Sequence, residues 1–232
     1  MFDLDGKVAC VTGSNGLLGK EFCLALEAAG AVVVGVDINK CEMPDTKSLK
    51  HYVCDLTNEM AVVDFVDNTK KIFGKIDILI NSAAINPKAE NLHLNESVDG
   101  DFTKYSLKNW NLSLSVNLTG MFLITREVCK VMEANNYGKI VNISSTYGIC
   151  APDQRIYLDE LSRQTMFKPV DYSVSKAGVQ GFTKYLASFY RETGIRVNTL
   201  SPGGTFNDNE EQFVRNYSAN TILGRMAAPG DY

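Results

Sequence analysis

The stretch that decides the fold runs from Lys7 to Asp37 and reads KVACVTGSNGLLGKEFCLALEAAGAVVVGVD. It begins with a short apolar, β-branched run at 7–12, which predicts a buried strand. Apolar residues then recur at helical spacing over 17–29, and Gly30 ends that helix before a second apolar run at 31–36. The stretch therefore predicts a parallel strand-helix-strand unit in which residues 13–19 form the first turn.

That turn reads Thr-Gly-x-x-Gly-x-x-Gly from Thr12 to Gly19. Glycines at these places let backbone N–H groups approach a pyrophosphate, which then rests on the positive end of the following helix. Asp37 ends the second strand about 20 residues further on, where a carboxylate accepts hydrogen bonds from the adenosine ribose and repels a 2′-phosphate. A glycine turn required only for packing is the alternative, and the acid at the strand end argues against it. The pattern predicts a dinucleotide site that favours NAD (NADH) over NADP.

The rest of the chain repeats the alternation of strands and helices. Strands are predicted near 51–54, 76–81, 138–144 and 195–200, and helices near 58–73, 108–134 and 172–192. The connection at 39–50 contains Pro44 and has room for little more than a helical turn. The pattern predicts an α/β fold with a Rossmann-type doubly wound parallel sheet, built as a single domain over residues 1–232, with its ligand at the carboxyl ends of the strands.

Composition and charge exclude several classes of function. The 232 residues are 45% hydrophobic and 22% charged, as in an ordinary globular protein, and the formal charge of -4 argues against a nucleic-acid partner. No apolar run approaches the roughly 20 residues that span a bilayer, and the first residues lack the basic start and apolar core of a signal peptide. We therefore expect a cytoplasmic protein with no membrane partner.

Cysteine and histidine usage argues against a metal site. The six cysteines are scattered, with no Cys-x-x-Cys, and the two histidines, His51 and His93, have no partner at ligand spacing. Cysteines in this pattern are typical of small buried residues in a reducing compartment. The sequence predicts no metal.

A candidate proton-transfer pair stands late in the chain, at Tyr172 and Lys176. Residues four apart on a helix share one face, so the lysine ammonium would favour the tyrosine phenolate and lower the pKa of the phenol. The spacing Tyr-x-x-x-Lys is common by itself, but here it follows a dinucleotide fingerprint and the hydroxyl pair Ser144-Ser145. This combination predicts a tyrosine that exchanges a proton near neutral pH.

In this order the motifs resemble the short-chain dehydrogenase/reductase family along nearly the whole chain. Besides the glycine turn and the Tyr-Lys pair, the resemblance rests on Asp55-Leu56, Asn81-Ser82-Ala83-Ala84, Asn117 in SVNLTG, Ser144-Ser145, Arg196-Val197-Asn198 and Ser201-Pro202-Gly203-Gly204-Thr205. The resemblance implies reversible hydride transfer between NAD(H) and a secondary alcohol or ketone. It also implies a homodimer or homotetramer, in which the helices near 108–134 and 172–192 pair across a two-fold axis.

The resemblance also implies a role for each matching residue. Tyr172 is the general acid/base, Lys176 also holds the nicotinamide ribose, and Ser145 donates to the substrate oxygen. Ser145 is preferred to Ser144 because the family's catalytic serine is the second of the pair, and Asn117 holds a water in the proton relay. The implied cofactor-binding residues are Gly13, Ser14, Asn15, Gly16, Leu17, Leu18, Asp37, Ile38, Asp55, Leu56, Asn81, Ala83, Tyr172, Lys176, Pro202, Gly203 and Thr205.

Two departures from the family pattern bear on the substrate. Leu17 stands where compact members carry glycine, and the resulting turn resembles the extended, sugar-nucleotide-modifying branch; Ser82 and Ala84 replace asparagine and glycine. The stretch 144–157 is also similar to oxidoreductases encoded with flagellin-glycosylation and nonulosonic-acid pathways. A sugar-linked substrate is therefore favoured over an ordinary hydroxy compound. A catalytically silent NAD-binding regulator, or an epimerase or dehydratase, remains an alternative.

Two connections are longer than plain crossovers require. Residues 85–108 and 146–170 both leave the carboxyl edge of the sheet, and loops of this length in a compact domain are usually functional or disordered. We predict that they are substrate lids; surface decoration or a subunit contact is the alternative. Five of their basic residues are candidates for contact with an anionic substrate group: Lys88, Lys104, Arg155, Arg163 and Lys168.

The last ten residues, from Leu223 to Tyr232, resemble the family segment that leads into a further helix and strand. We therefore expect that the natural chain continues beyond Tyr232 and that, without the further strand, one edge of the sheet is uncovered.

Overall fold

The computed structural model describes residues 3–41, 43–86 and 100–232. Its centre is a parallel sheet with the strand order β3-β2-β1-β4-β5-β6. The chain adds strands on one side of β1 up to β3 and then continues with β4 on the other side of β1. This is the strand order of a doubly wound dinucleotide-binding sheet, and it confirms the fold predicted from the sequence. The strands are β1 (Val8–Thr12), β2 (Val32–Asp37), β3 (Leu49–Val53), β4 (Ile78–Asn81), β5 (Gly138–Ile143) and β6 (Ile195–Leu200).

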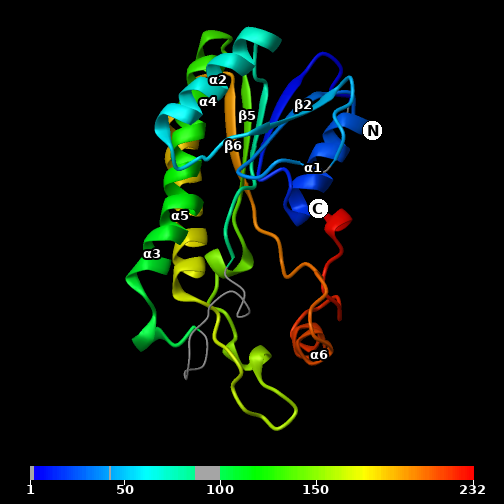
Figure 1. The fold of residues 1–232 in the computed structure, drawn as a ribbon, viewed down its shortest axis with the longest axis vertical. Coiled ribbons are helices and arrows are strands. Elements are labelled where there is room, and N and C mark those ends of the chain that lie inside the picture. Colours follow the sequence, from blue (N-terminus) through cyan, green and yellow to red (C-terminus); the bar gives the residue numbers. More distant parts are fainter. Residues whose placement is uncertain (1–2, 42, 87–99) are drawn as a thin grey trace.

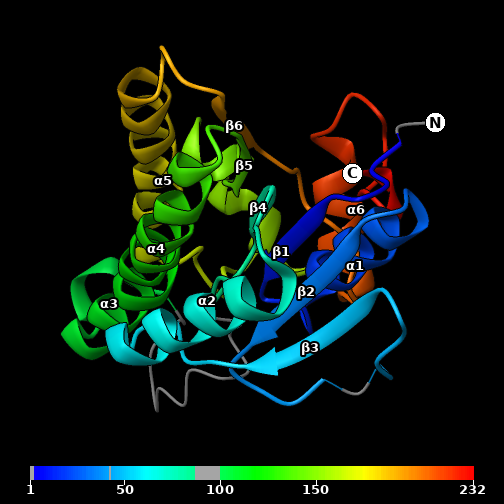
Figure 2. The same ribbon diagram turned by 90° about the horizontal axis from the view of Figure 1, so that it is seen from above.

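Helices cover both faces of the sheet (Figures 1 and 2). On one face α2 (Glu59–Phe73), α4 (Met121–Ala134) and α5 (Val170–Phe189) enclose the larger core, in which Ile124 and Val128 pack against β-strand residues such as Cys10 and Leu79. On the other face α1 (Leu17–Ala28) packs over the alternate side chains of β1 and β2. The side chains of β1 are shared between the two cores, because successive side chains of a strand point to opposite faces of the sheet.

The predicted helix at 108–134 is divided into three parts. It consists of α3 (Leu107–Leu114), a π-helical turn (Ser115–Gly120) and α4. Single π-helical turns inside α-helices are frequent at functional sites. Gly120 ends the turn against the loop after β3, where a Cβ atom would lie 3.2 Å from Leu56 Cβ. The sequence pattern did not predict this break, because apolar residues recur on both sides of it.

Other element boundaries also differ from the predicted ones. β3 begins at Leu49, two residues before the predicted strand, and α5 begins at Val170 because Pro169 precedes its first turn. The described part of the connection from β2 to β3 contains no helix, where the sequence left room for little more than a helical turn. β6 is one edge of the sheet that the described residues form.

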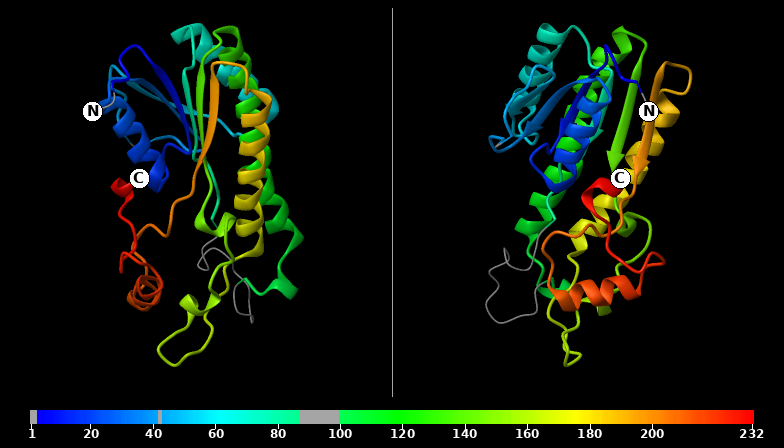
Figure 3. Two further views of the ribbon diagram at one scale, coloured as in Figure 1. Left: turned by 180° about the vertical axis from the view of Figure 1, so that it is seen from behind. Right: turned by 90° about the vertical axis from the view of Figure 1, so that its right-hand side faces the viewer.

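Beyond the carboxyl ends of the strands lie the segment 146–170 and α6 (Glu211–Ala219), at one end of the molecule (Figure 3). The sequence pattern did not predict α6. Two 3-10 turns, Thr146–Gly148 and Gln154–Tyr157, interrupt the long segment. Of the other predicted lid, 85–108, residues 87–99 lie outside the described residues, so the structure does not test that lid.

No helix in the described part of the chain combines the length and apolar character needed to cross a membrane. Within the same residues, no group of three or more histidine, cysteine, aspartate or glutamate side chains is placed to hold a metal ion.

Candidate active site

The glycine turn is closely packed between β1 and α1. Gly13 has a φ of +68°, and a Cβ atom there would lie 2.7 Å from Ala83 Cα in the loop after β4. A Cβ at Gly19 would overlap the carbonyl oxygen of Gly13. Gly16, the residue before α1, provides no side-chain cap, so the first N–H groups of the helix are open to a ligand. This is the arrangement that binds a pyrophosphate.

Asp37 is fixed at the end of β2 by backbone donors on both sides. Its Oδ2 accepts from the backbone N–H of Asn15 over 3.1 Å, and its Oδ1 accepts from that of Asn39 over 3.1 Å. The Asn15 side chain in turn donates to the carbonyl oxygen of Asn39 over 2.8 Å. Asn15 therefore orients the carboxylate and the loop that follows it.

Ser144 and Ser145 have different surroundings at the end of β5. The Ser144 hydroxyl donates to the carbonyl oxygen of Lys176 over 2.7 Å and is buried, which fastens α5 to the strand. Ser145 Oγ instead accepts from the N–H of Tyr147 over 3.2 Å, which leaves its own proton to donate. The Ser145 hydroxyl can therefore donate toward the cavity, and its contact with a substrate oxygen stays a prediction.

Tyr172 and Lys176 occupy one face of α5 beside Ser145. The Lys176 ammonium lies 5.7 Å from the centroid of the Tyr172 ring and donates to the carbonyl oxygen of Ile143 over 2.8 Å. Burial lowers the pKa of Lys176 to about 8. Burial also raises the pKa of the Tyr172 phenol, while the neighbouring Ser145 hydroxyl acts in the opposite direction. The lowered tyrosine pKa expected from the sequence is therefore not found, because desolvation of the phenol outweighs the effect of its neighbours.

One cavity of about 600 Å³ joins the glycine turn to Tyr172 along the carboxyl ends of the strands. Ser145 and most of the predicted cofactor residues line it. The predicted lining residues are Gly13, Gly16, Leu17, Leu18, Asp37, Ile38, Asp55, Leu56, Ala83, Tyr172, Lys176, Pro202, Gly203 and Thr205.

Four predicted residues do not line this cavity. Ser14 is buried beneath β2, where a Cβ at Gly35 would lie 2.9 Å from Ser14 Cβ, and Asn15 acts through Asp37 as described above. The buried Asn81 side chain donates to Thr125 Oγ1 and Asn142 Oδ1, both over 2.8 Å. Contact between these side chains and the cofactor is thus not supported, because each points toward the core or a neighbouring loop.

Asn117, in the π-helical turn, is the fourth. Its Oδ1 accepts from the N–H of Ile85 over 2.8 Å, and its Nδ2 donates to the carbonyl oxygen of Ile85 and to Ser175 Oγ, both over 3.1 Å. These bonds tie the loop after β4 to α5. The side chain holds the walls of the cavity together, and its part in a proton relay stays a prediction.

The end of the cavity near Tyr172 has an aromatic wall that the sequence analysis did not predict. Tyr157, from the segment 146–170, and Phe213, from α6, have ring centroids 5.4 Å apart, and Phe213 lies 6.0 Å from Tyr217. Tyr147 also lines this end, and burial raises its pKa to about 12. The spacing of Phe213, Val214 and Tyr217 at i, i+1 and i+4 was the sequence signal that could have revealed α6 and this wall.

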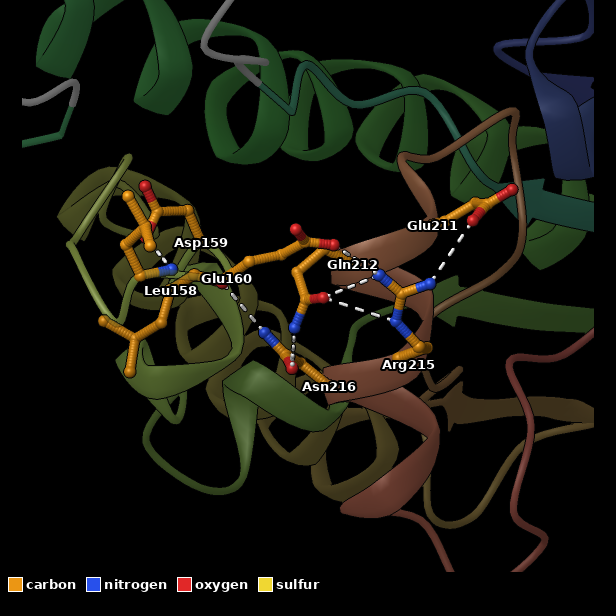
Figure 4. Close-up of polar contacts among 8 residues, drawn as sticks. Leu158, Asp159, Glu160, Glu211, Gln212, Arg215 and Asn216 are labelled. Carbon is orange, nitrogen blue, oxygen red and sulfur yellow. Dashed lines mark hydrogen bonds and ion pairs between the residues drawn. The ribbon is translucent and has the colours of Figure 1, made fainter.

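Hydrogen bonds attach α6 to the long segment (Figure 4). The Asn216 side chain donates to the carbonyl oxygens of Ile156 and Leu158 over 3.1 and 3.0 Å. Arg215 forms an ion pair with Glu160 over 3.3 Å, at the molecular surface. The segment and the helix therefore form one continuous wall of the cavity.

Comparisons with known proteins agree with this geometry. A family model described as Enoyl-(Acyl carrier protein) reductase matches residues 14–231. D-threitol dehydrogenase of Mycolicibacterium smegmatis is 34% identical over 209 residues, covering 87% of this chain and 71% of that protein. Acetoacetyl-CoA reductase of Acinetobacter sp. is 29% identical over 239 residues, covering 97% of this chain and 86% of that protein. The chain belongs to the short-chain dehydrogenase/reductase family.

A solved member of this family is similar along almost the whole chain. The short-chain dehydrogenase from Leptospira borgpetersenii, crystallised with bound NAD+, superposes with a TM-score of 0.86 at 30% identity, covering 99% of this chain and 83% of that chain. The protein is accordingly an oxidoreductase of the short-chain dehydrogenase/reductase type that acts on CH–OH groups. The sequence resemblance that predicted this family is confirmed.

Proposed function

We propose that this short-chain dehydrogenase/reductase uses NAD(H) to interconvert a secondary alcohol and its ketone on a small polyhydroxy compound. The observation that carries the proposal is one cavity with Asp37 at one end and Ser145, Tyr172 and Lys176 at the other. The bound nicotinamide would supply or accept the hydride. The protein positions the substrate and moves the proton.

The choice of NAD over NADP rests on charge around Asp37. Both carboxylate oxygens are held by backbone N–H groups, so the acid cannot easily turn away from a ligand. Of the described residues that line the cavity, only Lys168 and Lys176 are basic, and both stand beside Tyr172. A 2′-phosphate near Asp37 would therefore meet a negative charge without a cation to offset it.

In the proton step, Tyr172 donates to the ketone oxygen during reduction and accepts from the alcohol during oxidation. Burial keeps the pKa of Tyr172 above its ordinary value, so the phenol is protonated near neutral pH. That protonation state suits ketone reduction. Ser145, whose Oγ already accepts from Tyr147 N–H, donates its proton to the substrate oxygen and stabilises charge that develops there.

Lys176 acts on both Tyr172 and the cofactor. Its ammonium, anchored to Ile143, lies close enough to Tyr172 to stabilise a phenolate, and it would hold the nicotinamide ribose hydroxyls. Asn117 keeps the loop after β4 against α5 and so preserves the width of the cavity.

The aromatic wall supports a polyhydroxy substrate. Rings such as those of Tyr157 and Phe213 offer flat apolar faces to the C–H groups of a sugar or polyol, while Asn207 and Asn209, which also line the cavity, offer amide donors and acceptors. The similarity to a D-threitol dehydrogenase favours the same class. The similarity to an acetoacetyl-CoA reductase makes acyl thioesters the competing class.

A substrate panel tests the proposal. Purified enzyme would be assayed by NADH absorbance with polyols, sugars, sugar nucleotides and acetoacetyl-CoA, each with NAD(H) and with NADP(H). We expect turnover with polyhydroxy compounds and NAD(H). Turnover confined to acyl thioesters would refute the substrate class, and NADH binding without turnover of any member would favour the NAD-binding regulator.

A further inference from the structure

A second lysine stands at the catalytic end of the cavity. The Lys168 ammonium lies over the face of the Tyr172 ring, 4.0 Å from its centroid, and 5.8 Å from the centroid of the Tyr147 ring. Lys168 lines the cavity, and it is not among the residues to which the proposed hydride transfer gives a role. A cation this close to the proton donor requires its own explanation.

Hydrogen bonds fix the position of Lys168. The Gln154 side chain accepts from the Lys168 backbone N–H over 2.7 Å and donates to the Lys168 carbonyl oxygen over 3.5 Å. Gln154 is itself held, because its carbonyl oxygen accepts from Gln164 Nε2 over 2.8 Å. At its tip, the Lys168 ammonium donates to Asn86 Oδ1. These hydrogen bonds therefore direct the lysine along the cavity wall.

Three other basic residues that the sequence offered as candidates are used differently. Arg155 pairs with Asp153 over 2.7 Å, Arg163 pairs with Asp159 over 2.7 Å, and the Lys104 ammonium lies 4.0 Å from the Asp101 carboxylate. Each is offset by an acid within four residues along the chain. Lys88 lies outside the described residues.

Lys168 has no such partner: across the described ranges 3–41, 43–86 and 100–232, no carboxylate forms an ion pair with it. The buried acid Asp171 still influences its titration, but its effect is smaller than that of desolvation, which lowers the pKa of Lys168 to about 8. A cation that burial penalises, and that a neutral amide contacts, has unused capacity for an anion.

We propose that Lys168 binds an acidic group of the substrate, a carboxylate or a phosphate, close to the carbon that exchanges the hydride. The inference rests on the proposed function and narrows its substrate to an acidic polyhydroxy compound. The geometry supports it because the ammonium and the Tyr172 ring share one wall, so an anion on Lys168 lies beside the group that Tyr172 protonates. The Asn86 side chain, which accepts from the ammonium, lines the same part of the cavity.

The competing explanation is that Lys168 serves only Tyr172. A cation over an aromatic face is attracted by the ring quadrupole, and this attraction alone could hold the phenol in place. The two explanations differ in one measurable respect. A ligand for an acidic group discriminates between acidic and neutral substrates, whereas a residue that only positions Tyr172 affects both equally.

The test uses three probes that share a four-carbon skeleton: D-threitol, D-threonate and the monophosphate ester of D-threitol. Their affinities for the enzyme saturated with NADH would be measured by calorimetry, and their turnover by NADH absorbance. The variants are Lys168→Gln, Lys168→Arg and the matched control Lys184→Gln, which removes an exposed lysine of α5 outside the cavity.

In the wild type, we expect one acidic probe to bind at least about tenfold more tightly than D-threitol, as a charge-assisted contact implies. Lys168→Gln should bring the ratio of the acidic probe's affinity to that of D-threitol close to one. Lys168→Arg should keep most of this affinity ratio because the charge remains, and Lys184→Gln should leave it unchanged. The acidic probe that responds identifies the group as carboxylate or phosphate.

Two results would overturn the inference. One is that the wild type binds the acidic probes and D-threitol with nearly equal affinity, and the other is that Lys168→Gln keeps the wild-type preference for an acidic probe. If Lys168→Gln reduced turnover equally for acidic and neutral probes and shifted the pH profile of the rate, the role of Lys168 would be to position Tyr172 instead. Failure of the proposed function would look different, because no probe would reduce NAD+ even where binding discriminates.

Discussion

The side-chain amide of Asn216 on α6 donates to the carbonyl oxygen of Leu158 over 3.0 Å (Figure 4). This bond joins two segments that are 58 residues apart, beside the end of the cavity that Tyr172 lines. Around it, Leu158 and Gln164 form an antiparallel bridge, and Thr165 N–H donates to the carbonyl oxygen of Tyr157 over 3.1 Å. The predicted substrate lid is thus a hairpin-like unit attached to α6.

Substitution of Asn216 tests whether this wall serves the substrate. Asn216→Ala removes two donors to the segment, so Tyr157 and Phe213 should lose their fixed spacing. We expect KM for the alcohol or ketone to rise about threefold to tenfold, in line with a loss of about 1 kcal/mol, while the Kd for NADH stays within twofold. Steady-state kinetics and NADH fluorescence titration measure the two quantities.

The matched control is Asn220→Ala, at the end of the same helix, where the amide bonds only within α6. It should leave both quantities unchanged. Equal changes in KM and in the Kd for NADH would mean that Asn216 supports the whole cavity instead of its substrate end.

Asp37 should determine cofactor preference. Asp37→Ala removes the acceptor for the ribose hydroxyls and the charge that repels a 2′-phosphate. We expect the Kd for NADH to rise about tenfold and the preference over NADPH to narrow, because a charged acceptor contributes about 1.5–3 kcal/mol. Calorimetric titration with both cofactors measures this, with Asp67→Ala on the exposed side of α2 as the control. A wild type that binds NADPH as tightly as NADH would contradict the assignment.

Tyr172 should be required for the proton step only. Tyr172→Phe keeps the ring and removes the hydroxyl, so kcat should fall at least about 100-fold while the Kd for NADH stays nearly constant. Tyr185→Phe, on the exposed side of α5, is the control and should keep its activity. Turnover close to the wild-type value in Tyr172→Phe would refute the mechanism.

The raised pKa of Tyr172 gives the two directions of the reaction opposite pH profiles. Reduction requires the phenol, which stays protonated across the neutral range, so its rate should be nearly level there and fall in alkali. Oxidation requires the phenolate, so its rate should rise with pH over the same range. Initial rates measured in both directions from pH 6 to pH 10 test this. An oxidation rate that is level across this range would contradict the raised pKa.

Lys176 should lower stability at neutral pH. Its pKa falls from the model-peptide value to about 8 on folding, so between pH 8 and the unfolded value the unfolded chain binds more protons, and the free energy of unfolding rises with pH. Below pH 8 the full cost of burying the charge is present. Lys176→Met should therefore raise the free energy of unfolding at pH 7 by about 1–2 kcal/mol while abolishing activity.

That gain is smaller than the roughly 3 kcal/mol implied by the pKa shift, because the carbonyl oxygen of Ile143 loses its donor. Urea denaturation at pH 7 and pH 10 measures the effect, which should shrink at the higher pH. A destabilised Lys176→Met at pH 7 would mean that the lost hydrogen bond outweighs the relieved charge.

The sequence by itself determined the sheet, the glycine turn after β1 and the placement of Tyr172 and Lys176 on one helix. Apolar runs of strand length alternated with helical periodicity, and this pattern is local enough to be read without knowing the tertiary contacts. Gly13, Gly19 and Asp37 could be placed because backbone conformation and strand ends constrain these positions. Tyr172 and Lys176 could be placed because four residues make one helical turn.

The tertiary structure decided which side chains point into the cavity. Asn81 and Ser14 stand within cofactor motifs, yet neither side chain lines the cavity. Asn81 belongs to a polar network in the core, and Ser14 packs against Gly35. It also decided the electrostatics, since the pKa of Tyr172 depends on how deeply the phenol is buried. Lys168 was one of five basic residues that the sequence offered as candidates in the two long connections, and only folding placed it against Tyr172. Charge pairing and burial depend on contacts between distant segments, so the sequence pattern alone could not distinguish Lys168 from the others.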